Sequence, residues 1–128
     1  MMIAFRCGQA EVSFSGAVPP ADVAGRRAKR FKATWNIGAG FLGGGIRLSG
    51  EVLDLSTTGV LVRCSKDLEV GTTGRLGVDL GYDTIRVGAV VRRCIPKVGV
   101  AFEFTRMSPH DRELLRRLLM RLAASHQT

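Results

Sequence analysis

Two short motifs hold the residues of this chain that could bind a ligand through charge and hydrogen bonding. In the first, Arg26 and Arg30 stand four positions apart, with Arg27 beside Arg26. The second, Asp54–Gly59, has an acid, a hydroxyl and a glycine at D-x-S-x-x-G spacing and begins 24 positions after Arg30. The planar guanidinium group suits phosphate oxygens and the O6/N7 edge of guanine, and Asp and Ser can hydrogen-bond the edge of a base. The two motifs together therefore predict a site for a guanine nucleotide.

The order and separation of the motifs resemble those of the PilZ domain, a bacterial receptor for cyclic di-GMP. Each motif alone is common, but their order, the strands that follow and a closing helix make the match specific over most of the chain. The resemblance implies that Arg26 and Arg30 clamp the phosphates and guanine edges of cyclic di-GMP, with Arg27 assisting. By the same resemblance, Asp54 and Ser56 hold guanine.

Two glycines complete this interpretation of the site. The resemblance gives Gly59 the role of supplying a backbone conformation that is closed to residues with a Cβ atom. Gly25 stands directly before Arg26, where PilZ domains that take up an intercalated ligand dimer commonly carry a further arginine. The sequence therefore leaves open whether one or two ligand molecules bind.

The basic segment around these arginines carries five cationic residues among seven, over positions 26–32. Like charges repel one another, so we expect the segment to be mobile and not to rest against Asp54 by itself. A bound ligand with two phosphates would then order it.

Alternating apolar and polar residues predict six short strands that would position the motifs. The predicted strands are Phe31–Ile37, Ile46–Leu53, Val60–Cys64, Gly71–Leu80, Thr84–Cys94 and Val98–Phe104. No helical pattern separates them, which favours an antiparallel barrel or sandwich, and PilZ domains are six-stranded antiparallel barrels. The glycine-rich stretch Gly38–Gly45 lacks the Gly-Lys-Ser/Thr ending of a phosphate-binding loop and is interpreted as a hairpin connection.

A helix over residues 108–124 is predicted to close the chain. Ser108 suits the N-cap, Pro109 the first helical position, and Asp111 completes a capping box. A stripe of leucines at helical spacing is expected to pack on the barrel. These leucines are Leu114, Leu115, Leu118, Leu119 and Leu122. Docking of the helix onto a partner protein, or a weak homodimer, is left as an alternative.

The resulting fold class is all-β with a C-terminal helix, and the domain organisation is simple. We expect residues 1–24 to form a mobile tail, with a single strand lying on the barrel as the alternative. Residues 25–124 would form one PilZ-like β-barrel domain that includes the helix. At 128 residues the chain can bury one core.

Charge and composition narrow the class of function. The net charge is +8 and 15 of the 19 basic residues are arginine, which favours an anionic partner, although a GC-rich genome would enrich arginine as well. Nucleic acid is not favoured, because the chain has one Trp and one Tyr and lacks an aromatic stacking platform. Three cysteines and two histidines show neither disulfide-framework nor metal-ligand spacing.

We therefore expect a binding protein and not an enzyme, with no metal, no cofactor and cyclic di-GMP as its ligand. No apolar run is long enough for a membrane span and no signal peptide is evident, so a cytoplasmic location is expected. The receptor would change conformation on binding and signal to a downstream protein partner. The alternative is a PilZ-like adaptor that binds protein and no nucleotide.

Overall fold

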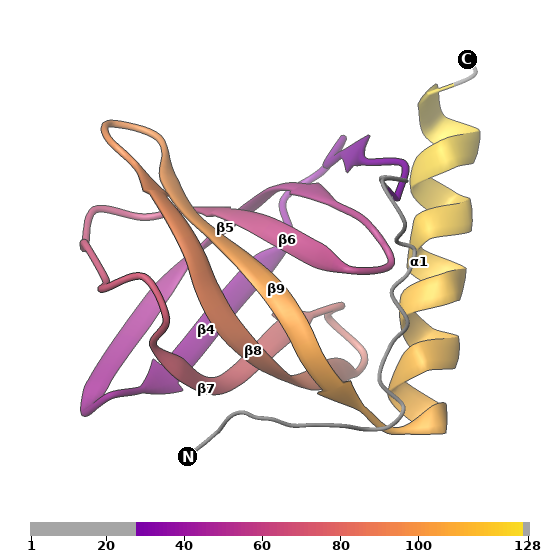
Figure 1. The fold of residues 1–128 in the computed structure, drawn as a ribbon. Coiled ribbons are helices and arrows are strands. Elements are labelled where there is room, and N and C mark those ends of the chain that lie inside the picture. The colour runs from indigo at the N-terminus through magenta and orange to yellow at the C-terminus, as the bar shows by residue number, and fades with distance from the viewer. Residues whose placement is uncertain (1–27, 127–128) are drawn as a thin grey trace.

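The computed structural model describes residues 28–126, which form seven strands and one helix (Figure 1). In chain order these elements are β3 (Phe31–Lys32), β4 (Gly38–Gly43), β5 (Ile46–Leu55), β6 (Gly59–Arg63), β7 (Thr73–Asp79), β8 (Thr84–Ile95), β9 (Gly99–Met107) and α1 (Pro109–His126).

Six of the strands close into an antiparallel barrel. Neighbouring strands follow the order β5–β4–β7–β8–β9–β6, and pairing of β5 with β6 closes the ring. The remaining strand, β3, pairs with the last two residues of β5, beyond the part of β5 that pairs with β4. The predicted fold class, a six-stranded antiparallel barrel with a C-terminal helix, is confirmed.

The first strand of the barrel lies at a different place in the sequence from the predicted one. A strand was expected over Phe31–Ile37 and a loop over Gly38–Gly45, but the first range contains only the two-residue β3. The sixth barrel strand is instead Gly38–Gly43, which lies inside the predicted loop. The prediction of a hairpin loop over these residues is therefore wrong.

The physical reason lies in how β4 alternates. Ala39 and Phe41 point into the barrel and are buried, while Gly38 and Gly40, at the alternate positions, are exposed and hide the period-2 pattern. The turn that joins β4 to β5 is confined to Gly44 and Gly45, whose φ angles of 59° and 75° favour glycine.

The helix α1 begins as its capping residues predict and packs on the barrel. Ser108 Oγ accepts a hydrogen bond from the Asp111 amide at 3.1 Å and donates one to Asp111 Oδ2 at 2.6 Å. The five leucines of the predicted stripe are buried in one cluster with the barrel interior. Figure 1 shows α1 alongside the barrel, where it contacts β8 and β3. Packing of the predicted helix on the barrel is confirmed.

Within residues 28–126, no helix combines the length and the apolar character that crossing a membrane requires. Cys64 and Cys94 are free thiols.

Candidate functional site

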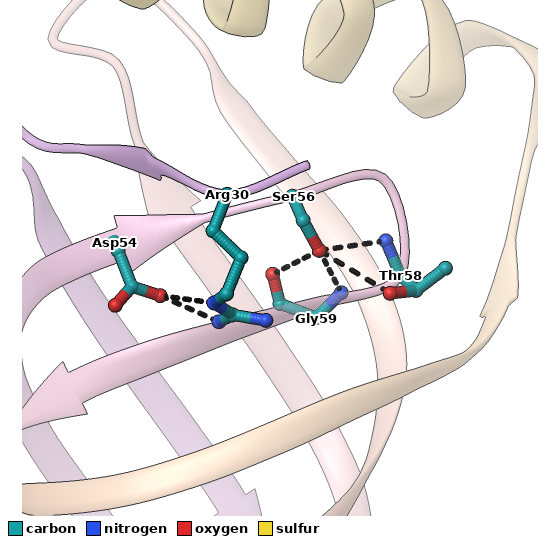
Figure 2. Close-up of polar contacts among 5 residues, drawn as sticks. All are labelled: Arg30, Asp54, Ser56, Thr58 and Gly59. Atoms are coloured by element: carbon teal, nitrogen blue, oxygen red, sulfur yellow. Dashed lines mark hydrogen bonds and ion pairs between the residues drawn. The ribbon is translucent and has the colours of Figure 1, made fainter. Parts of the chain in front are cut away.

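The two motifs meet at an ion pair between Arg30 and Asp54. Arg30 Nε donates to Asp54 Oδ1 at 2.7 Å, and Nη2 lies 2.5 Å from the same oxygen (Figure 2). Pairing of β3 with β5 brings the two residues together, because it places Lys32 directly opposite Asp54 and Arg30 just before β3. The expectation that this segment does not rest against Asp54 by itself is wrong for Arg30, since backbone pairing anchors the chain next to it.

The arginine and the carboxylate remain accessible. The Arg30 side chain is 45 % exposed and that of Asp54 is 23 % exposed. Asp54 Oδ2 receives no hydrogen bond from any residue between 28 and 126, so one oxygen of the carboxylate is still able to accept. The geometry therefore offers both donors and an acceptor on the same face.

Ser56 has a different environment, because its hydroxyl organises the turn between β5 and β6. The residue is fully buried, and its Oγ accepts hydrogen bonds from the amides of Thr58 and Gly59, each at 3.1 Å. The Ser56 amide in turn donates to the Gly59 carbonyl oxygen at 2.9 Å. Figure 2 shows this hydroxyl pointing into its own turn and not toward Arg30. A direct contact between Ser56 and guanine therefore stays a prediction.

Gly59 is needed for a reason other than the expected one. Its φ lies outside the left-handed region, so the expectation of a backbone conformation closed to other residues is wrong. A Cβ atom at this position would instead collide with the carbonyl oxygen of Phe102 on β9. The glycine permits close approach of β6 and β9 directly after the turn.

Arg26 and Arg27 lie outside the described residues, so their predicted roles stay predictions. Lys32, which sequence reasoning did not single out, stands opposite Asp54. Only the register of a two-residue strand places it there, and spacing along the chain carries no signal for such a pairing.

The segment that follows Arg30 contacts the end of α1. Thr34 Oγ1 and Ser125 Oγ lie 2.7 Å apart in a hydrogen bond. The guanidinium carbon of Arg121 lies 5.1 Å from the centre of the Trp35 ring, within cation–π distance. The chain thus runs from the ion pair to the helix within a few residues.

The site residues fall inside a match to a family model. The model, described as PilZ domain, matches residues 25–121 of this chain. The chain belongs to the PilZ family. No curated protein matches the sequence.

Solved structures resemble this PilZ domain at low sequence identity. YcgR from Escherichia coli, in complex with c-di-GMP, is 20 % identical with a TM-score of 0.67, over 80 % of this chain and 48 % of that one. The chain therefore spans about half the length of that YcgR structure. The Bacillus subtilis inhibitor of motility, MotI/DgrA, is 19 % identical with a TM-score of 0.63, over 78 % of this chain and 52 % of that one.

The PilZ domain of CeSA from a cellulose-synthesizing bacterium is 23 % identical with a TM-score of 0.61, over 75 % of this chain and 99 % of that one. At these identities the structural likenesses establish the fold. The function has to be argued from the site itself.

Proposed function

We propose that this chain is a bacterial cytoplasmic receptor for cyclic di-GMP. The observation that carries the proposal is the ion pair of Arg30 with Asp54, because it joins the two motifs of a PilZ domain on one accessible face. Membership of the family and the complex of YcgR with c-di-GMP support the choice of ligand. No catalytic step is invoked, since the role is binding.

Each residue of the site has a chemical role in the proposal. Arg30 uses its remaining N–H groups on a phosphate or on the O6/N7 edge of guanine, and Arg26 and Arg27 contribute further donors. Asp54 accepts from the base through Oδ2 while Oδ1 stays with Arg30. Ser56 holds the turn between β5 and β6 in position beside the ligand. It hydrogen-bonds the base directly only if its hydroxyl rotates outward.

Binding would be passed to a partner protein through α1. The segment beside Arg30 touches the helix through Thr34 and Trp35, so a ligand that repositions Arg30 also acts on these two contacts. A change in the position or stability of α1 is then the signal that a downstream partner detects.

Calorimetric titration with cyclic di-GMP tests the proposal. We expect the wild-type protein to bind and Arg30→Ala and Asp54→Ala each to weaken binding roughly ten- to a hundredfold, since a charge-assisted hydrogen bond contributes about 1.5–3 kcal/mol. Cyclic di-AMP should bind at least about ten times more weakly, because its base edge mispairs with Asp54. Arg75→Ala, on β7, removes the same charge elsewhere and should bind as the wild type does.

A folded wild-type protein that shows no heat of binding at any accessible concentration would contradict the proposal. That result would favour the alternative, a PilZ-like adaptor that binds protein alone. Equal affinity for the two dinucleotides would mean that the site reads phosphate and not guanine.

A further inference from the structure

The strand register aligns a row of outward-facing side chains with Asp54. Asp54 on β5 pairs with Leu61 on β6, Leu61 pairs with Ala101 on β9, and Ala101 pairs with Arg93 on β8. At about 4.8 Å between strands, Arg93 lies roughly 14 Å from Asp54 along the row. The strands β5, β6, β9 and β8 are consecutive neighbours in the barrel, and Figure 1 shows β8 and β9 next to each other.

The two residues in the middle of this row have apolar side chains that project only a short way from the sheet. Leu61 lies between the inward-facing Val60 and Val62, so its half-buried side chain faces outward, and Ala101 does the same on β9. A leucine and an alanine offer a flat floor without charge, which suits the face of a planar base. The charged groups stand at the two ends, with Asp54 and Arg30 at one and Arg93 at the other.

Arg93 differs from Arg92 beside it in having no side-chain partner among the described residues. No side chain between residues 28 and 126 forms an ion pair or hydrogen bond with its guanidinium group, which lies on the exposed surface. Arg92, by contrast, is paired with Glu103. A β-bulge between Val91 and Arg93 turns the two arginines to different neighbours. Within the described part of the chain, Arg93 is therefore an unpaired cation at the far end of the row that begins at Asp54.

We propose that Arg93 is a guanine-recognising residue of the site and binds the second base of cyclic di-GMP. This inference rests on the proposed function and extends it. A cyclic dinucleotide carries a base on each side of its sugar–phosphate ring, so one molecule can contact strands that are not neighbours. One guanine is held at Asp54 and Arg30, while the other lies over Leu61 and Ala101. The fork of Arg93 then bonds the O6 and N7 atoms of that second guanine.

A mixed ligand separates this role from a general effect of charge. Cyclic GMP–AMP can place its guanine at Asp54, which leaves adenine, with an amino group in place of O6, at Arg93. We expect wild-type protein to bind cyclic GMP–AMP about tenfold more weakly than cyclic di-GMP. Arg93→Ala should weaken the affinity for cyclic di-GMP about tenfold. It should change the affinity for cyclic GMP–AMP by no more than about twofold, so the preference for cyclic di-GMP disappears.

Arg75→Ala is the matched control, because Arg75 is an exposed arginine of β7 that has no partner within residues 28–126, and β7 takes no part in the row. Its affinity for both ligands should equal that of the wild type. Equal losses for the two ligands in Arg93→Ala, no loss for either, or a comparable loss in Arg75→Ala would each overturn the inference while leaving the proposed receptor intact. Failure of the wild-type protein to bind cyclic di-GMP would instead overturn both.

Discussion

Arg30 and Asp54, 24 positions apart in the sequence, share a hydrogen bond of 2.7 Å across the start of β3 and the end of β5. The pair is partly exposed, and such surface ion pairs contribute about 0–1 kcal/mol to stability. The contact therefore positions the two side chains for binding more than it holds the fold together.

Arg30→Ala should consequently leave the free energy of unfolding within about 1 kcal/mol of the wild-type value while weakening binding strongly. Urea denaturation measures the first quantity and calorimetry the second. A loss of stability much larger than 1 kcal/mol would mean that Arg30 is a structural residue and that its effect on binding is indirect.

Ser56→Ala should behave in the opposite way, with a clear loss of stability. The change leaves the amides of Thr58 and Gly59 without their acceptor, and an unsatisfied buried group costs about 1–3 kcal/mol. Thr57→Ala is the control, since Thr57 is exposed in the same turn. Equal unfolding free energies for the two variants would show that the Ser56 hydroxyl does not hold the turn.

Gly59→Ala tests the close approach of β6 and β9. The added methyl group meets the Phe102 carbonyl oxygen, so the strands must separate, at a cost of about 1–3 kcal/mol. We expect a lower Tm and faster amide exchange at the start of β6. Gly45→Ala is the control, because its added methyl group meets no neighbouring atom and the only strain comes from the positive φ of the turn. It should therefore leave amide exchange at the start of β6 unchanged.

Asp111 should make the stability of α1 depend on pH. Burial by itself raises the pKa of Asp111, but hydrogen bonds from Ser108 and from the Arg86 amide outweigh it, and the pKa lies below its ordinary value of 3.8. A carboxyl with a lowered pKa stabilises the fold fully above its unfolded value and loses this contribution as the pH falls through the folded value. Asp111→Asn should therefore melt below the wild type at pH 7, and the difference should shrink below about pH 4. A difference in Tm that stays constant with pH would contradict this role.

Trp35, the single tryptophan of the chain, should report on the coupling between the site and α1. Titration with cyclic di-GMP should change its fluorescence, because the ligand acts a few residues away at Arg30. Arg121→Ala removes the cation from above the ring and should reduce the ligand-induced change. An identical change in the variant and the wild type would show that the signal does not pass through this contact.

The sequence was sufficient for the fold class and for α1, because these depend on local patterns. Period-2 alternation identified five of the barrel strands, and Ser108 and Asp111 marked the start of the helix. The remaining strand, β4, was missed because glycine has no side chain with which to show a period. The environment of the site residues depends on pairing between distant strands, so the contact of Arg30 with Asp54 and the fit of Gly59 against Phe102 could not be read from spacing.

The hydrogen bond between Thr34 and Ser125 has a consequence for how the domain assembles. It joins residues 91 positions apart, and within the barrel β6 pairs with β9, which is distant from it in the sequence. Contacts of such long sequence separation form slowly, typically in milliseconds to seconds for β-rich domains. During synthesis, the residues beside Arg30 would leave the ribosome well before the helix that they touch. The ligand site would thus reach its final form only after the last element of the domain has been made.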